Sequence, residues 1–364
     1  MVPFLESKNK IPVESCEAEN SMSFARKAWI WLQVAVWMVM LARPLVAQEA
    51  ISLVGSGSNL AGPLYSAWTE QYGKQHPGVQ VRYLPLGTAQ SIKEIREGSG
   101  DFGGGEIPLS EAQKHGGKNT LTQFPTVVVA IVPIYKLAGK PELRFSGEVL
   151  AEIYLGNIKN WKDPQIAKLN PGVALPDLAV TVVHLSGVKG SNYILTDFLS
   201  KASAEWKSKI GKSASPNWPV GVEQNRSEGM MTKVGATPGA IGYVELTNAK
   251  RKDIGYGSVQ NAASQFVKPT NASILAACTA SEKSMPEDLG ASLANAAGKE
   301  SYPLVSFTWI YVPASGLAPE RSRALKDFWN WALADGQEIA GGLGYTQLPS
   351  SIASKAHEAV NSIQ

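Results

Sequence analysis

Three glycine-rich turns are the segments of this sequence in which chemistry is expected. They are residues 55–62 (GSGSNLAG), 87–91 (GTAQS) and 187–191 (GVKGS). Each turn follows a strand-like run and precedes a helix-like run, so that backbone N–H groups at the helix start are left free to bind an anion. In open α/β sheets such turns gather at the carboxyl ends of the strands, where ligands bind. The sequence therefore predicts an anion site built from these turns.

The first turn does not match a dinucleotide-binding turn. The pattern G-x-G-x-x-G requires a small residue where Leu60 stands. An anion site at the helix start fits this turn better. A plainer interpretation stays open, in which Ser58 or Asn59 only caps the helix.

The third turn carries Lys189, the cation that the sequence offers to a bound anion. The turn follows the strand-like residues 179–184, and Leu185 stands at the junction. A lysine supplies a point charge, whereas an arginine would supply a planar, two-pronged donor. A second interpretation stays open, in which Lys189 only projects into solvent.

The histidines argue against an enzyme. His76, His115, His184 and His357 are scattered, and none lies at metal-ligand spacing from another. Phosphoryl hydrolysis needs a metal cluster or an activated nucleophile. His184 and Glu106 form a candidate acid–base pair, but a histidine packed at its strand end is the favoured interpretation. We therefore expect no catalysis, no metal and no cofactor.

Residues 1–47 predict an export signal. Arg26 and Lys27 precede an apolar run at residues 28–40 (AWIWLQVAVWMVM), and a small-residue cleavage site ends at Ala47. This order is typical of a secretory signal, and the run is shorter than the ~20 residues that cross a membrane. A membrane anchor remains the alternative. Because residues 1–21 are polar and unpatterned, translation from Met22 is a second alternative.

The composition is that of an ordinary globular chain. The 364 residues are 44% hydrophobic and 18% charged, with a formal charge of +3, and no Lys/Arg run suggests nucleic-acid binding. The length allows two domains. Only Cys278 follows the predicted cleavage site, so no internal disulfide is expected.

Strand-like and helix-like runs alternate after the signal, which predicts an α/β fold. The strand-like runs are residues 50–54, 79–84, 124–132, 180–183, 240–244 and 304–312. Apolar residues at helical spacing occur in three places, namely Leu64, Trp68 and Tyr72; Ile92 and Ile95; and Leu325, Phe328, Trp329 and Ala332. Residues 256–301 are rich in Ala, Ser and Asn and predict helix and loop.

Several motifs together resemble the phosphate-binding proteins of the phosphate-specific ABC transporter. They include residues 55–72 (GSGSNLAGPLYSAWTEQY), 101–110 (DFGGGEIPLS), 123–135 (QFPTVVVAIVPIY) and 238–245 (PGAIGYVE), and the resemblance covers nearly all of residues 50–363. It implies a type II periplasmic binding protein fold, with two α/β lobes joined by two crossover strands. Lobe 1 would comprise residues 48–131 and 305–364, and lobe 2 residues 132–304. The runs at residues 126–133 and 304–312 would be the crossovers.

The resemblance implies a phosphate site, from which this sequence departs. The family pattern has Thr-Phe in the first turn and Asp in the motif DFGASDAPL, where this chain has Asn59-Leu60 and Glu106. Leu185 replaces the family's Arg, whereas Thr88 keeps the hydroxyl of the family's Ser. The ligand-binding residues expected from the resemblance are Ser58, Asn59, Leu60, Thr88, Glu106, Lys189, Gly190 and Ser191.

Two of these residues carry specific expectations. Lys189 can replace the charge of the missing arginine but not its geometry. The Glu106 carboxylate would repel an anion that has no proton to donate, and so would favour hydrogenphosphate over sulfate. A plainer interpretation of Glu106, as a solvated carboxylate at a helix start, stays open.

The function implied is a periplasmic, monomeric protein that binds phosphate between its lobes and delivers it to permease subunits of an ABC transporter in the inner membrane. Two alternatives stay open because of the altered pocket. In one, the pocket is retuned to another small oxyanion or an organic phosphate. In the other, binding has faded and the fold serves as a scaffold or sensor.

Overall fold

The computed structural model describes residue 29 and residues 50–251 and 254–364, and residues 50–364 form one compact unit. The predicted signal and its cleavage site therefore lie outside the described residues, apart from Trp29. Among the described helices, none has both the length and the apolar character needed to cross a membrane.

Strands and helices alternate through residues 50–364, as the sequence predicts. The strands are β1 (Ile51–Gly57), β2 (Val79–Leu84), β3 (Phe102–Gly105), β4 (Leu121–Tyr135), β5 (Arg144–Phe145), β6 (Thr181–Leu185), β7 (Val222–Gln224), β8 (Ala240–Glu245), β9 (Ser258–Gln260), β10 (Phe266–Val267) and β11 (Val305–Pro313). The helices are α2 (Gly62–Gln75), α3 (Thr88–Arg96), α4 (Glu111–His115), α5 (Gly147–Leu155), α6 (Pro164–Leu169), α7 (Gly190–Ala202), α8 (Ala204–Lys209), α9 (Ser227–Ala236), α10 (Leu246–Arg251), α11 (Asn271–Ser281), α12 (Pro319–Leu333), α13 (Gly336–Gly342) and α14 (Ser350–Asn361), with a 3₁₀ turn at Glu282–Ser284.

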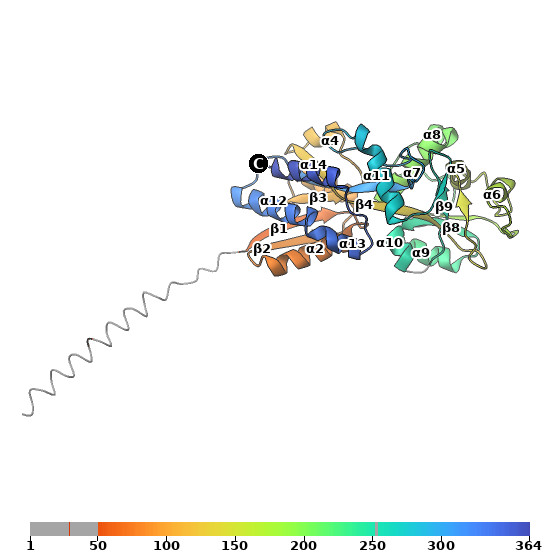
Figure 1. Cartoon of the computed structure of the whole chain (residues 1–364), viewed down its shortest axis with the longest axis horizontal. Coiled ribbons are helices and arrows are strands. Elements are labelled where there is room, and N and C mark those ends of the chain that lie inside the picture. The colour runs from red at the N-terminus through yellow and green to blue at the C-terminus, as the bar shows by residue number, and fades with distance from the viewer. Residues whose placement is uncertain (1–28, 30–49, 252–253) are drawn as a thin grey trace, which may run out of the picture. The chain divides into compact units, whose positions relative to one another are not determined.

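An eight-stranded sheet with the order β2-β1-β3-β11-β4-β8-β6-β7 runs through the unit (Figure 1). β1 is parallel to β2 and β3, and β6 is parallel to β7 and β8. The long strand β4 pairs with β11 as far as Ala130 and with β8 from Ile131 onward. The sheet thus has two halves, each with its own parallel strands. This change of partner supports the predicted lobe boundary near residue 131, which stays a prediction.

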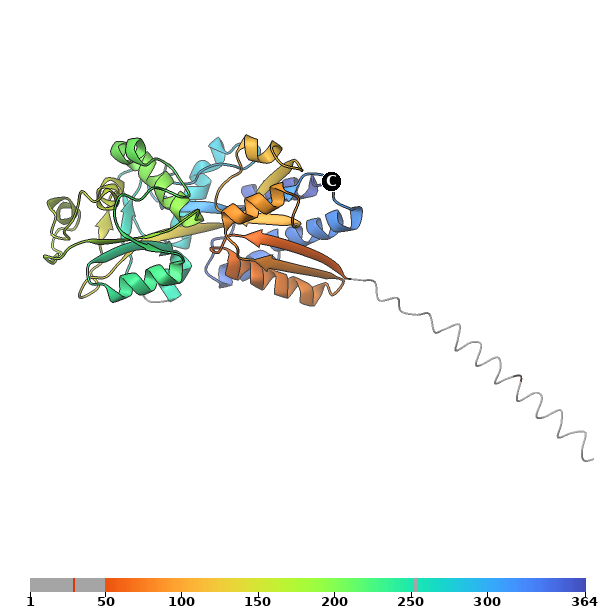
Figure 2. The ribbon, with the colours of Figure 1, turned by 180° about the vertical axis from the view of Figure 1, so that it is seen from behind.

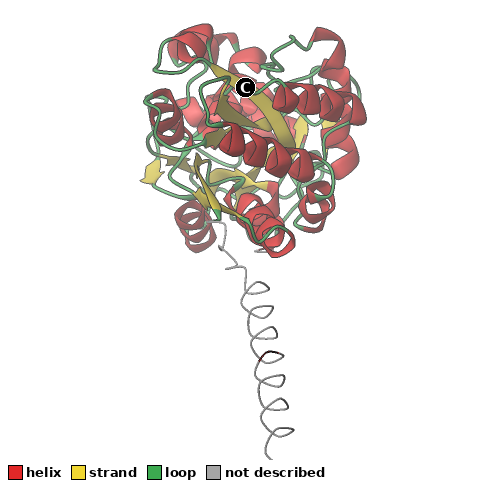
Figure 3. Cartoon of the chain, turned by 90° about the vertical axis from the view of Figure 1, so that its left-hand side faces the viewer, coloured by secondary structure: helices red, strands yellow, loops and turns green. Residues whose placement is uncertain are grey.

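Helices cover the strands on the outside of the unit (Figure 3). Seen from behind, α2 runs beside β1 and β2 (Figure 2). The apolar residues whose spacing predicts α2, namely Leu64, Trp68 and Tyr72, are all buried. This face of the helix therefore packs against the core. Helix α12 packs on β1 in the same half.

The glycine-rich strand β3 was not predicted, because glycine is disfavoured in strands. Its glycines are required by close packing. A Cβ on Gly103 would lie 2.5 Å from Ser91 Oγ, and one on Gly105 would collide with the Thr88 side chain. Because these side chains are absent, α3 can approach β3 closely and present Thr88 at the strand end.

The prediction for residues 256–301 is wrong in part. Besides α11, this segment contains β9 and β10, which form a three-stranded sheet with β5. Strands of two or three residues are too short to show an alternating pattern. Cys278, in α11, is fully buried and free.

Trp329 is the centre of the core in the half that contains β1. Its ring is fully buried and lies within 6.4 Å, centroid to centroid, of the rings of Tyr65, Trp68, Phe102, Phe124 and Phe328. Such edge-to-face arrangements stabilise aromatic clusters beyond the effect of burial alone.

We expect Trp329→Ala to lower the free energy of unfolding by about 3–5 kcal/mol, because it leaves a large cavity among these rings. Urea titration followed by circular dichroism measures this change. Trp331→Ala is the matched control, since Trp331 is only partly buried and its loss should have a smaller effect. Equal midpoints for the two variants would contradict this assignment of the core.

Candidate functional site

The carboxyl ends of β1, β2 and β3 bring three polar side chains together. Ser58 follows β1, Thr88 opens α3 after β2, and Glu106 follows β3. The Ser58 hydroxyl donates a hydrogen bond to Oε1 of Glu106, and the Thr88 hydroxyl donates one to Oε2 at 3.3 Å. All three side chains are buried. The strand ends therefore form a small pocket that surrounds the Glu106 carboxyl group.

Burial determines the protonation of Glu106. The side chain is inaccessible to solvent, and this burial raises its pKa to about 7, although the hydrogen bonds from Ser58 and Thr88 oppose the shift. The negative charge of Glu245 raises the pKa further. No ion pair involving Glu106 is found in the described part of the chain. Glu106 can therefore be neutral or charged near neutral pH.

Hydrogen bonds from neighbouring elements hold this pocket in place. Tyr83 of β2 donates to the carbonyl oxygen of Ser58 at 2.9 Å. Ser91 of α3 donates to the carbonyl oxygen of Ser56 and accepts from the backbone N–H of Gly104, both at 2.9 Å. Helix α3 is thus tied to β1 and β3 at the point where these strands end.

The loop between β6 and α7 faces this pocket from the other half of the sheet, and Asn192 holds it. The side-chain amide of Asn192 donates to the carbonyl oxygens of Leu185, Gly187 and Ala214 at 3.1–3.2 Å. Its amide oxygen accepts a hydrogen bond from the hydroxyl of Tyr243. Asn192 thus ties the loop between β6 and α7 to the segment that carries Ala214 and to Tyr243 of β8.

The start of α7 lies directly against Glu106. Gly190 has no room for a Cβ, because the Glu106 carboxyl group occupies that position. The next hydroxyl, that of Ser191, is fully buried and has no hydrogen-bond partner. No side chain caps the helix, whose first backbone N–H groups have no partners within the helix.

A cleft of about 330 Å³ opens beside this pocket. It is lined by Asn59, Leu60, Gly62, Pro63, Ser66 and Pro85 from one half of the sheet and by Leu185, Lys189, Ser191, Asn225, Arg226, Ser227, Glu228, Glu245 and Asn248 from the other. Helices α2, α7 and α9 all begin at this cleft, which favours an anion there. Lys189 and Arg226 contribute positive charge, and neither forms an ion pair with the described residues.

Glu245, at the end of β8, is a second buried acid on the cleft. Its carboxylate accepts hydrogen bonds from Ser227 at 2.9 Å and from Asn248 at 2.6 Å. Burial raises its pKa, and these hydrogen bonds oppose the shift. The cleft thus combines two cations, the partly buried Lys189 and the exposed Arg226, with buried acids.

The structure brings the predicted ligand-binding residues to one region but divides them into two groups. Ser58, Thr88 and Gly190 surround Glu106, and Ser191 follows them at the start of α7. The remaining predicted residues, Asn59, Leu60 and Lys189, line the cleft outside this pocket. Ser58 also accepts from the backbone N–H of Leu60 at 2.9 Å, within the turn, whereas Ala61 is the N-cap of α2 and no side chain caps this helix, so the capping interpretation of Ser58 or Asn59 is wrong.

Two plainer expectations can be compared with the structure. Glu106 is not a solvated carboxylate, because it is fully buried. His184 stacks on Trp218 with ring centroids 5.1 Å apart, burial lowers its pKa, and its Nδ1 has no partner. This packing agrees with a strand-end histidine rather than an acid–base pair with Glu106. Within the described residues, no group of three His, Cys, Asp or Glu side chains could hold a metal ion.

Sequence reasoning missed Asn192, Arg226 and Glu245. Arg226 follows β7, whose three residues are too few for a strand signal. Asn192 directly follows the third turn, and Glu245 ends a motif that was used only for the resemblance. A polar residue directly after a buried strand was the one signal that could have identified Glu245.

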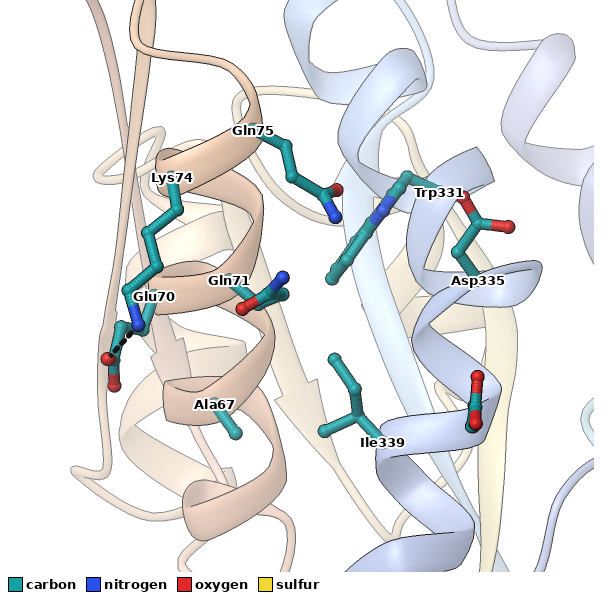
Figure 4. Close-up of a pocket in the computed structure, with 9 residues that line it drawn as sticks. Ala67, Glu70, Gln71, Lys74, Gln75, Trp331, Asp335 and Ile339 are labelled. Atoms are coloured by element: carbon teal, nitrogen blue, oxygen red, sulfur yellow. Dashed lines mark hydrogen bonds and ion pairs between the residues drawn. The ribbon is translucent and has the colours of Figure 1, made fainter.

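A larger hollow of about 530 Å³ lies elsewhere, between α2 and the α12–α13 region (Figure 4). It is a surface groove with exposed Glu70 and Lys74 on one wall, joined by an ion pair of 2.6 Å, and Trp331 and Ile339 on the other. It contains no strand end and no start of a long helix. The cleft at the strand ends is therefore the better candidate site.

Comparison with known proteins finds relatives over most of the chain. The family model described as "PBP superfamily domain" matches residues 44–336. The chain is 36% identical to the phosphate-binding protein PstS of Pasteurella multocida, over 84% of this chain and 89% of that protein. It is 35% identical to PstS of Xylella fastidiosa, over 84% and 83%.

The fold agrees with solved structures as well. A high-affinity periplasmic phosphate-binding protein, PfluDING, superposes with a TM-score of 0.66 at 19% identity, over 85% of this chain and 93% of that one. The predicted two-lobe type II fold is thereby confirmed. The chain therefore belongs to the PBP superfamily and, within it, to the family of the phosphate-binding proteins PstS.

Proposed function

We propose that the protein is a periplasmic solute-binding protein that binds inorganic phosphate in the cleft at the strand ends and delivers it to an ABC permease. The observation that carries this proposal is that the cleft lies at the strand ends, between the two halves of the sheet. The chain is also 36% identical to a phosphate-binding protein PstS. Three helices begin at the cleft, and Lys189 and Arg226 line it without forming ion pairs in the described part of the chain.

The charges of the cleft support a ligand that carries both negative charge and a proton. The helix starts and the two cations favour an anion. The buried acids Glu106 and Glu245 disfavour an anion that cannot donate a hydrogen bond to them. Hydrogenphosphate meets both conditions, whereas sulfate meets only the first.

A second candidate ligand, an organic phosphate, is favoured by the volume of the cleft. A cleft of about 330 Å³ has room for roughly ten water molecules at about 30 Å³ each. Apolar side chains such as Leu60 and Pro63 line part of it. A phosphate monoester could place its phosphate near Lys189 and its organic part along these side chains.

Export to the periplasm, a monomeric state and docking on permease subunits complete the proposal. Export is supported by the predicted signal at residues 1–47, and the other two by the resemblance to the family. Permease and ATPase genes beside the gene for this protein would favour transport over a scaffold or sensor role.

We expect Lys189→Ala to weaken phosphate binding by about one to two orders of magnitude. A charge-assisted hydrogen bond contributes about 1.5–3 kcal/mol, and about 1.4 kcal/mol corresponds to a tenfold change in Kd. Lys189→Arg should not restore the parent affinity, because the guanidinium fork would start from a different backbone position. Isothermal titration with phosphate, sulfate and arsenate measures both effects.

Lys207→Ala is the matched control, since Lys207 is an exposed lysine of α8 that does not line the cleft. Its affinity should equal that of the parent. If Lys189→Ala binds phosphate as tightly as the parent, the role proposed for Lys189 is wrong. If the parent binds none of the three anions but binds a phosphate monoester, the second candidate replaces the first.

Asn192→Ala should lower the free energy of unfolding by about 1–3 kcal/mol, because it removes the hydrogen bonds to the loop and leaves the buried hydroxyl of Tyr243 without its acceptor. It should also weaken phosphate binding, since the loop that carries Lys189 loses its support. Urea unfolding and titration check the two effects. Asn157→Ala is the control at an exposed asparagine. Unchanged affinity in Asn192→Ala would show that the loop does not need this support.

A further inference from the structure

The inner pocket already holds a carboxyl group that belongs to the protein. Ser58 donates to one oxygen of Glu106 and Thr88 to the other. On the opposite side, the carboxyl group packs against Gly190 at the start of α7. Two hydroxyl donors and a helix start are the groups that an oxyanion would use.

The length of the glutamate side chain accounts for this position. The resemblance places an aspartate here, which is one methylene shorter. The extra methylene carries the Glu106 carboxyl group across to Gly190, where there is no space left for even a Cβ. A free oxyanion cannot occupy the same position at the same time.

The pocket also contains a donor that the carboxyl group does not use. The Ser191 hydroxyl is fully buried, lacks a partner and lines the cleft. A buried hydroxyl without a partner is costly. A tetrahedral oxyanion has more oxygen atoms than a carboxylate and could accept from Ser191 as well.

We infer that the Glu106 carboxylate is an internal ligand, which occupies the inner anion pocket and competes with free oxyanions for it. This inference deepens the proposed function, because it concerns the same cleft. The ionised carboxylate blocks the pocket and repels anions. The protonated group can move aside or donate a hydrogen bond to the incoming ligand.

The direction of the pH dependence follows from the groups that face Glu106. These are Tyr65 of α2, Tyr83 of β2, Tyr311 of β11, Glu245 of β8 and, at the edge of the cleft, Lys189. Burial raises the pKa of Glu106 to about 7, above its ordinary value, so the folded protein holds this proton more tightly than the unfolded chain. As pH rises toward and through 7, Glu106 ionises, which lowers stability and weakens oxyanion binding.

Removal of the side chain should convert the internal ligand into a site for a free carboxylate. We expect acetate at about 100 mM to raise the Tm of Glu106→Ala by about 2 °C or more, and to leave the parent unchanged. Sodium chloride at equal ionic strength controls for salt. Glu148→Ala is the control at an exposed acid of α5 outside the cleft, and acetate should not raise its Tm.

Titration with oxyanions then tests the competition. Glu106→Asp, whose side chain is one methylene shorter, should bind phosphate roughly tenfold tighter than the parent at pH 8.5. Sulfate is the probe for pH dependence, because its charge does not change between pH 5.5 and 8.5. The parent should bind sulfate more tightly at pH 5.5, and Glu106→Gln should lose this difference.

The outcomes separate this inference from the proposed function. Acetate rescue without any phosphate binding by the parent would support the internal ligand and overturn phosphate as the substrate. Phosphate binding by the parent without acetate rescue, and without a gain in Glu106→Asp, would support the proposed function and overturn the internal ligand. If Glu106→Ala does not fold, the Asp and Gln variants decide the question by titration alone.

Discussion

The burial of the Glu106 carboxyl group is the constraint on which the rest of the site depends. A buried acid without a cation is costly unless it is neutral or well supplied with hydrogen bonds. Here Ser58 and Thr88 supply the hydrogen bonds, and the raised pKa makes the neutral form accessible. Three strand ends and the start of α7 must meet around this group for the arrangement to exist. The sheet order, with β1 between β2 and β3, brings the three strand ends together.

Close packing of α3 on β3 allows the strand ends and the start of α7 to come together around Glu106. Glycines in this strand remove side chains that would collide with Ser91 and Thr88 of α3. Gly190 does the same on the opposite side, where its missing side chain admits the Glu106 carboxyl group. Glycine is therefore used here for space rather than for an unusual backbone conformation. Larger residues at these positions would separate the helices from the strand ends and open the pocket.

Two of the departures from the family pattern that the resemblance implies have related physical consequences. Leu185, in place of an arginine, removes a cation from the strand end and leaves an apolar, buried side chain there. Glu106, in place of an aspartate, brings a carboxyl group further into the pocket. Without a neighbouring cation, a longer buried acid is driven toward its neutral form. Lys189 and Arg226 remain as positive charges, but both lie at the cleft rather than beside Glu106.

The sequence by itself determined the α/β class, the main strands and the turns that supply the site. Long apolar runs such as residues 124–132 and helical spacing such as Leu64, Trp68 and Tyr72 are local patterns, and local patterns can be recognised without a structure. The short strands β9 and β10 and the glycine strand β3 were missed, because their stability comes from partners distant in sequence. Only the tertiary structure decided where the Glu106 carboxyl group lies and that Arg226 and Glu245 share its cleft. Those positions depend on how strand ends far apart in the chain are brought together, which no local pattern records.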